Sequence, residues 1–179
     1  MILRPDRLAD GGPIYHETQL DRLVVEPFNA LSALVFVIIV VYWLVRLRGR
    51  FAQERFLTFC LVIMGIGGVG GTLYHAFRVS RWFLLMDWLP IAILVVASAV
   101  YFYRQLLRRG WHTALIVLAL FAGNGLLFGV LRRVGGVSDH LIINTNYSLM
   151  GLFVAVPFVW WLTRTGYAHG RYILGAVAS

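Results

Sequence analysis

The chain alternates between long apolar runs and short groups of charged residues. Read from one group of charges to the next, it contains five apolar runs, at residues 28–45, 56–77, 82–103, 110–131 and 141–163. Each run has 18 to 23 residues, and a helix of that length spans the ~30 Å hydrocarbon thickness of a bilayer. No run shows the alternation over ~10-residue segments that is typical of a membrane β-strand. The pattern therefore predicts an all-α, polytopic bundle of transmembrane helices.

The composition also indicates a membrane protein. Of 179 residues, 60% are hydrophobic and 13% are charged, and the mean hydropathy is +0.77, whereas soluble domains are about 45–50% apolar with about a quarter charged. The 16 basic residues are all arginines. They lie between the apolar runs, as Arg78 and Arg81 do, and form no basic face with interleaved aromatic residues. We interpret the arginines as anchors at the membrane edge. The expected partner is therefore the bilayer, and we expect no binding of nucleic acid.

The two ends of the chain differ from its middle. Residues 1–27 are polar and lack the apolar core of a signal peptide, so we assign them to an extramembrane segment and residues 28–179 to the membrane domain. The last run, 172–179, has about a third of the length of a crossing. It either lies at the interface or begins a sixth helix of a longer protein. The loops on one side of the membrane contain slightly more arginines than those on the other. This small bias favours an N-terminus outside the cell.

Unusual polar residues collect on one side of the membrane. Alternating spans bring the N-terminal segment, the end of the second span and the starts of the third and fifth to the same side. His75 and Asp87 lie there at similar depth. An ionisable group in the hydrocarbon region costs ~2.5–3.5 kcal/mol on insertion scales and is tolerated chiefly beside a protein interior, a cavity or a metal. The pair is equally compatible with metal or catalytic chemistry and with a structural salt bridge or cap.

The second span contains five glycines between residues 65 and 71, a density that helix propensity disfavours. Gly67, Gly71 and His75 follow one another at intervals of four residues. A neighbouring helix can therefore approach closely below His75, which then emerges at a helix junction. Ordinary helix packing explains the glycines alone, but their combination with His75 favours a buried polar site.

Oxygen-bearing side chains precede and begin the first span. Glu26 and Asn29 lie three residues apart on one helical face, and Glu17 precedes them. Such hard ligands can hold Ca²⁺, which takes ~6–8 oxygens, although these residues alone favour a solvated acidic helix start. In the fifth span, Asn144 and Asn146 occupy positions where apolar residues are expected. We predict that these polar side chains hydrogen-bond between helices.

Three short segments occur in order along the chain: EPFNALS at 26–32, GVGGTLYHAF at 68–77 and DWLP at 87–90. Together they resemble the alkaline ceramidase family and its bacterial relatives, which belong to a superfamily of seven-helix intramembrane hydrolases. The resemblance implies Zn²⁺ bound by three histidines, one at the end of the second helix and a His-x-x-x-His pair on the seventh. That pair has no counterpart here, so the resemblance implies five full spans, the start of a sixth and a missing last helix.

The same resemblance implies roles for individual residues. His75 matches the first zinc ligand, and Asp87 matches an aspartate beside the zinc-bound water. Glu17, Glu26 and Asn29 fall near positions that hold a structural Ca²⁺. The family serine four residues before the histidine is Gly71 here, so the adjacent Thr72 is the candidate for the assisting hydroxyl.

The resulting hypothesis is a zinc-dependent hydrolase in the bacterial inner membrane that cleaves the amide bond of ceramide or a related N-acyl lipid. Asp87 would take the proton of the attacking water and return it to the leaving amine. The alternative is a non-catalytic receptor-like or transporter-like bundle in which His75 and Asp87 form a polar relay. A zinc content lost on His75→Ala would distinguish the hydrolase from the relay.

Overall fold

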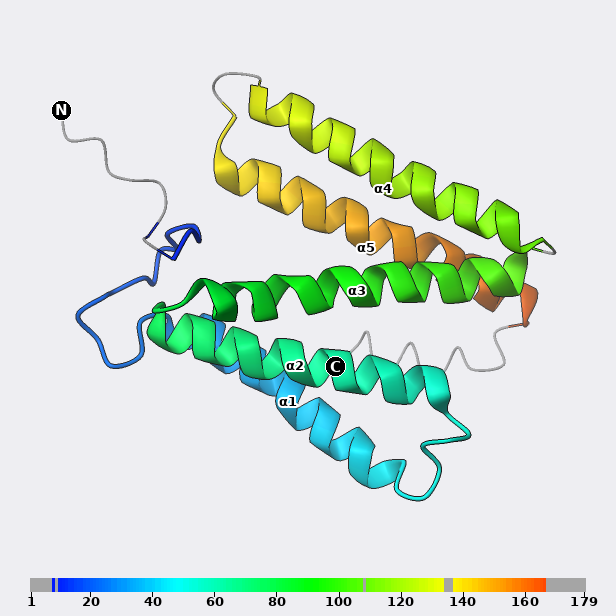
Figure 1. Cartoon of the computed structure of the whole chain (residues 1–179), viewed down its shortest axis with the longest axis horizontal. Helices are drawn as coiled ribbons and strands as arrows, with labels where there is room; N and C mark the ends of the chain where they lie inside the picture. Colours follow the sequence, from blue (N-terminus) through cyan, green and yellow to red (C-terminus); the bar gives the residue numbers. More distant parts are fainter. Residues whose placement is uncertain (1–7, 9, 108, 134–136, 167–179) are drawn as a thin grey trace. The chain divides into compact units, whose positions relative to one another are not determined.

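Five α-helices form the computed structural model, which describes residues 8, 10–107, 109–133 and 137–166 and has no β-strand among them. The helices are α1 (Pro27–Arg46), α2 (Arg55–Phe77), α3 (Arg81–Leu106), α4 (Gly110–Arg133) and α5 (Asp139–Arg164) (Figure 1). All five are long and apolar enough to cross a membrane. The five predicted spans are therefore confirmed to within a few residues, and the chain is a multi-pass membrane protein. The predicted sixth run, 172–179, lies outside the described residues.

The chain divides into two compact units, Met1–Leu94 and Val95–Ser179. In the first unit, α1 packs along α2 (Figure 1). Val40, Leu47 and Leu61 form the buried core of this contact. Near its other end the two backbones come closer, because a Cβ at Gly68 would lie 3.1 Å from the backbone nitrogen of Val37.

The first part of α3 approaches α2 through the glycines of the second span. A Cβ at Gly70 would collide with the side chain of Met86 and would lie 2.9 Å from its carbonyl carbon. A Cβ at Gly71 would lie 2.5 Å from Oδ1 of Asp87, well inside van der Waals contact. The predicted close approach of a neighbouring helix is confirmed, and it places the start of α3 directly against the end of α2.

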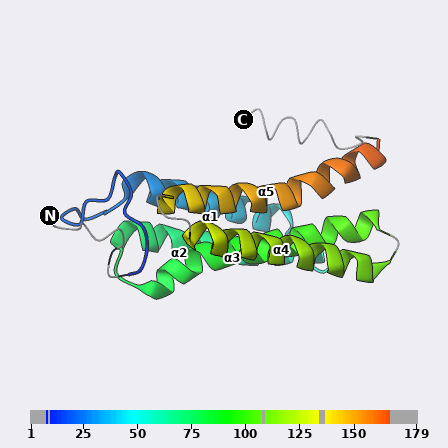
Figure 2. The same cartoon turned by 90° about the horizontal axis from the view of Figure 1, so that it is seen from above.

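The N-terminal segment, which we define as residues 10–26, lies across the end of α2 (Figure 2). The backbone N–H groups of Val25 and Glu26 donate to the carbonyl oxygens of Ala76 and His75 at 2.9 and 3.0 Å. The last carbonyls of a helix have no partner within the helix, so these two bonds satisfy groups that would otherwise be unpaired. The segment thereby becomes part of the first unit.

In the second unit, α4 packs against α5, and the later part of α3 contributes Ala99 and Tyr103 to a buried cluster with Val117. Asn124 of α4 donates from Nδ2 to Oδ1 of Asn146 on α5 at 2.7 Å. This bond confirms, for Asn146, the prediction that polar residues of the fifth span join helices.

Candidate functional site

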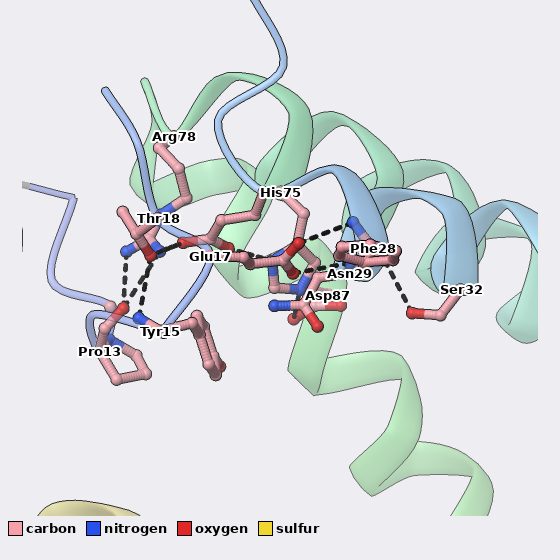
Figure 3. A network of polar contacts seen from close by, with 12 residues as sticks. Pro13, Tyr15, Glu17, Thr18, Phe28, Asn29, Ser32, His75, Arg78 and Asp87 are labelled. Atoms are coloured by element: carbon pink, nitrogen blue, oxygen red, sulfur yellow. Dashed lines mark hydrogen bonds and ion pairs between the residues drawn. The ribbon is translucent and has the colours of Figure 1, made fainter. Parts of the chain in front are cut away.

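The site is built where α2 ends, α3 begins and the N-terminal segment crosses them. His75, on the last turn of α2, is buried. Its Nδ1 lies 2.6 Å from Oε2 of Glu26, and its Nε2 lies 3.7 Å from Oδ2 of Asp87 (Figure 3). The structure therefore brings together three of the residues predicted from sequence, with one imidazole between two carboxylates.

Glu26 supports the inner side of the imidazole. Its side chain is fully buried, and its second oxygen, Oε1, accepts hydrogen bonds from the hydroxyl of Thr18 at 2.6 Å and from the guanidinium of Arg78. Burial alone would raise the pKa of Glu26, but hydrogen bonds from His75 and Thr18 and the charge of Arg78 outweigh it and lower the pKa below its ordinary value. Glu26 is therefore an acceptor, and His75 donates to it from Nδ1.

This hydrogen bond determines what the outer nitrogen can do. In a neutral imidazole with the proton on Nδ1, Nε2 carries a free lone pair. The separation of 3.7 Å from Asp87 exceeds hydrogen-bond distance, so Asp87 makes no hydrogen bond to Nε2. The side chain of Asp87 is 25% exposed and that of His75 is 10% exposed, which makes the aspartate side the open side of the site.

Two aromatic rings enclose His75. Tyr15, from the N-terminal segment, lies edge-on at a centroid separation of 5.8 Å, and the neighbouring Tyr74 lies at 4.8 Å. The two rings lie against an imidazole whose side chain is 10% exposed. On the first part of α3, five residues line an open hollow: Arg81, Trp82, Leu84, Leu85 and Trp88. Neither His75 nor Asp87 is among them.

Arg78 is the principal residue that the sequence interpretation missed. We predicted a membrane-edge anchor, but its side chain is fully buried. It follows α2 in a left-handed conformation with φ of 53°, at the end of the helix and before the turn into α3. Its Nε donates to Oδ2 of Asp10 at 2.7 Å, and its Nη1 donates to Glu26. The interpretation of Arg78 as an anchor is therefore wrong, because its partners lie within the protein.

Asp10 completes this ionic cluster. Its Oδ1 accepts from Nη2 of Arg78 at 3.1 Å and from the backbone N–H of Gly12 at 2.8 Å. Burial acts to raise the pKa of Asp10, but the bonds from Arg78 and Gly12 and the charges of Arg78 and Arg81 lower it overall. No periodicity or motif connects residues 10 and 78, so the sequence carried no signal for this pair.

Glu17, one of the residues predicted as calcium ligands, has structural partners at the start of α1, and the backbone of Asn29, another of them, is one of these partners. Glu17 accepts the backbone N–H groups of Phe28 and Asn29 at 2.7 and 2.8 Å (Figure 3). These are free donors of the first helical turn, so Glu17 acts as a helix cap supplied from a distant position. Glu26, the third predicted ligand, is bonded to His75, Thr18 and Arg78 as described. The donor set does not fit a calcium site, because the carboxylates already bind internal donors and a cation.

Thr72, the predicted assisting hydroxyl, donates from Oγ1 to the carbonyl of Gly68 at 2.7 Å. That bond lies within α2, and neither His75 nor Asp87 is a hydrogen-bond partner of Thr72 in the described part of the chain. At Gly71, one position earlier, a Cβ would lie 2.5 Å from Oδ1 of Asp87. A serine there would require the side chain of Asp87 to move.

The residues fit part of a zinc site. A ligating histidine usually donates its other ring nitrogen to a carboxylate, and His75 does so to Glu26 while Nε2 stays free. Among the described residues, however, no three histidine, cysteine, aspartate or glutamate side chains come together as a metal-binding group. His75 could therefore serve as one zinc ligand, and the remaining ligands would have to come from outside the described part of the chain.

Comparison with known proteins adds no relative. No protein-family model, curated protein or solved structure matches the chain. The ceramidase resemblance accordingly depends on the three segments quoted above, and any functional conclusion depends on the geometry of the site.

Proposed function

We propose that this membrane protein hydrolyses the amide bond of an N-acyl lipid, of which ceramide is the type suggested by the resemblance. The observation that carries the proposal is the imidazole of His75 between the buried carboxylate of Glu26 and the partly exposed carboxylate of Asp87. Perturbed carboxylates and an oriented imidazole at a membrane edge are features of hydrolytic sites. The hollow along α3, with its two tryptophans, supports an amphiphilic substrate, because indole rings favour the membrane interface.

The chain's own residues perform defined tasks in this proposal. Glu26 fixes the tautomer and orientation of His75, so that Nε2 presents its lone pair to the open side. Asp87 accepts a proton from the attacking water and returns it to the amine as the C–N bond breaks, which yields a fatty acid and a free amine. A zinc ion bound at His75 would lower the pKa of water and polarise the amide carbonyl.

The decisive measurement is release of fatty acid from an N-acyl sphingoid base by the purified protein in detergent micelles. We expect Asp87→Asn to lower kcat by roughly 10²–10⁴-fold, the usual contribution of a general acid–base group. Asp21→Asn is the matched control, because Asp21 is an exposed carboxylate of the N-terminal segment. Activity retained in Asp87→Asn at the level of this control would remove Asp87 from the mechanism.

Metal content tests the role of His75 separately. We expect zinc in the purified protein and its loss in His75→Ala, with His112→Ala on α4 as the control. Glu26→Gln should weaken zinc binding about 10–100-fold, because outer-shell partners of ligating histidines have effects of that size. Zinc that is retained in His75→Ala would exclude this histidine as a ligand.

A polar relay is the second candidate, and one observation favours it. The chain Glu26–His75–Asp87 runs from a buried ionic cluster to an open carboxylate, which is an arrangement that can pass a proton without a metal. Proton uptake by proteoliposomes, abolished in His75→Ala and independent of zinc, would support the relay over the hydrolase.

A further inference from the structure

The guanidinium of Arg78 has all of its hydrogen-bonding capacity satisfied by the N-terminal segment. An arginine offers five N–H donors in a planar fork. Here they make five bonds: two to Asp10, two to the carbonyl oxygen of Pro13 at 3.1 Å each, and one to Glu26. The ring of Tyr74 covers the guanidinium at 4.7 Å. The arrangement is a buried cation that is enclosed by two buried carboxylates and by the partly buried carbonyl of Pro13.

Oxygen ligands of this kind are also those that Ca²⁺ uses. The resemblance implies a calcium ion near Glu17, Glu26 and Asn29, yet the carboxylates there are engaged by Arg78, by His75 and by backbone N–H groups. A buried carboxylate requires a counter-charge or several donors. For Glu26 and Asp10, Arg78 is that counter-charge.

We infer that the guanidinium of Arg78 is a built-in cation that holds the N-terminal segment against the end of α2. It supplies the positive charge that the resemblance assigns to a calcium ion. The segment should therefore dock without divalent metal. Because Arg78 also donates to Glu26, which in turn holds His75, it is a positioning residue for the imidazole. That second role rests on the proposed function, whereas the docking role does not.

The backbone at this position permits a clean test. Arg78 has a positive φ, a conformation that glycine adopts at helix ends without steric penalty. Arg78→Gly therefore removes the cation without straining the chain. Arg22→Gln is the matched control, since Arg22 is an exposed arginine of the same segment.

Docking is measured on the whole protein in detergent by proteinase K cleavage within residues 10–26, with the fragments identified by mass spectrometry. We expect cleavage in Arg78→Gly to be roughly 100-fold faster, because removal of one partner leaves buried carboxylates uncompensated. Millimolar guanidinium chloride should restore part of the protection in this variant. Wild type and Arg22→Gln should be cleaved at equal rates in calcium and in EGTA.

The variant Asp10→Asn provides a second, independent test, because its effect on cleavage should change direction with the background. In the wild-type background it removes half of an ion pair and should accelerate cleavage. In the Arg78→Gly background it removes an uncompensated charge and should slow cleavage. Should Arg78→Gly fail to fold, Asp10→Asn alone still tests the pair, and an unchanged cleavage rate in that variant would overturn the inference.

Two further results would contradict the built-in cation. One is a wild-type protein whose segment opens in EGTA and closes again with calcium. The other is an Asp10→Asn effect of the same sign in both backgrounds. Neither readout involves lipid hydrolysis, so the inference survives or fails separately from the proposed function. Rescue of kcat by guanidinium in Arg78→Gly, without a change in KM, would in addition support the positioning of His75.

Discussion

Glycine-rich helices occur in both compact units, but their glycines have different surroundings. In α2, a Cβ at Gly70 or Gly71 would meet Met86 or Asp87 of α3. In α4, a Cβ at Gly125 or Gly129 would meet no atom within 4 Å among the described residues. Glycine density in a sequence therefore does not by itself report close helix packing. The α2 glycines differ because they allow the close approach that places Asp87 beside His75.

The polar contacts of the two units differ in the same way. The first unit buries an ionic cluster in which Arg78 joins Asp10 and Glu26. The second unit joins α4 to α5 through neutral amides, Asn124 and Asn146. A buried charge has a large desolvation penalty and a strong dependence on its partners, whereas an interhelical amide bond contributes modestly. The first unit should therefore be sensitive to single changes that the second tolerates.

The largest contrast should come from alanine at the two sets of glycines. Gly70→Ala places a methyl group against the backbone of Met86, and overpacking of this kind costs about 1–3 kcal/mol. The displacement of α3 should also move Asp87 from His75 and lower any hydrolytic activity. Gly125→Ala meets no neighbour and gains up to about 1 kcal/mol of helix propensity. The free energies of unfolding in mixed micelles measure both effects.

Equal destabilisation by Gly70→Ala and Gly125→Ala would remove the distinction between the two helices. Gly71→Ala refines it, because its Cβ would lie 2.5 Å from the Asp87 carboxylate. We expect Gly71→Ala to lower activity more than stability, since a side chain can rotate away where a backbone cannot.

Acid should open the first unit and leave the second unchanged. Burial would raise the pKa of Asp10, but Arg78, Gly12 and Arg81 lower the pKa below its ordinary value of 3.8. A lowered folded-state pKa contributes stability that is complete above the unfolded value and is lost as pH falls through the folded one. Protection of residues 10–26 from proteolysis should thus be constant from pH 7 to about 5 and fall below about 4, by up to about 2 kcal/mol.

Asp10→Asn controls for other titrating groups, including Glu26 and Asp87. The acid-dependent loss should be reduced in that variant, and the α4–α5 contact should show no loss over the same range because amides do not titrate. Identical pH profiles for wild type and Asp10→Asn would show that another group controls opening.

The sequence predicted those features that the bilayer imposes. Helix ends coincide with charges because each crossing must be apolar for about 30 Å, and His75 meets Asp87 because alternation of spans brings the two ends to one side. The roles of Arg78 and Glu17 could not be predicted in this way. Arg78 meets Asp10 and Glu26, which lie 52 to 68 residues away in the irregular N-terminal segment. Glu17 lies in the same segment, 11 to 12 residues before the N–H groups of α1 that it accepts. Neither helical period nor membrane depth constrains which groups such a segment meets.

The smallest expected effect concerns the amide pair of the second unit. Asn124→Leu leaves Asn146 without its donor, and bonds of this type between membrane helices contribute about 0.6 kcal/mol on average and at most about 2 kcal/mol. Asn146→Leu should have a similar effect, and the double variant should cost less than the sum because both polar groups are then removed. A double-mutant cycle on the free energy of unfolding measures this coupling. A coupling energy as large as that between Asp10 and Arg78 would mean that buried charge does not make the first unit more sensitive than the second. The two units would then differ only in their glycine contacts.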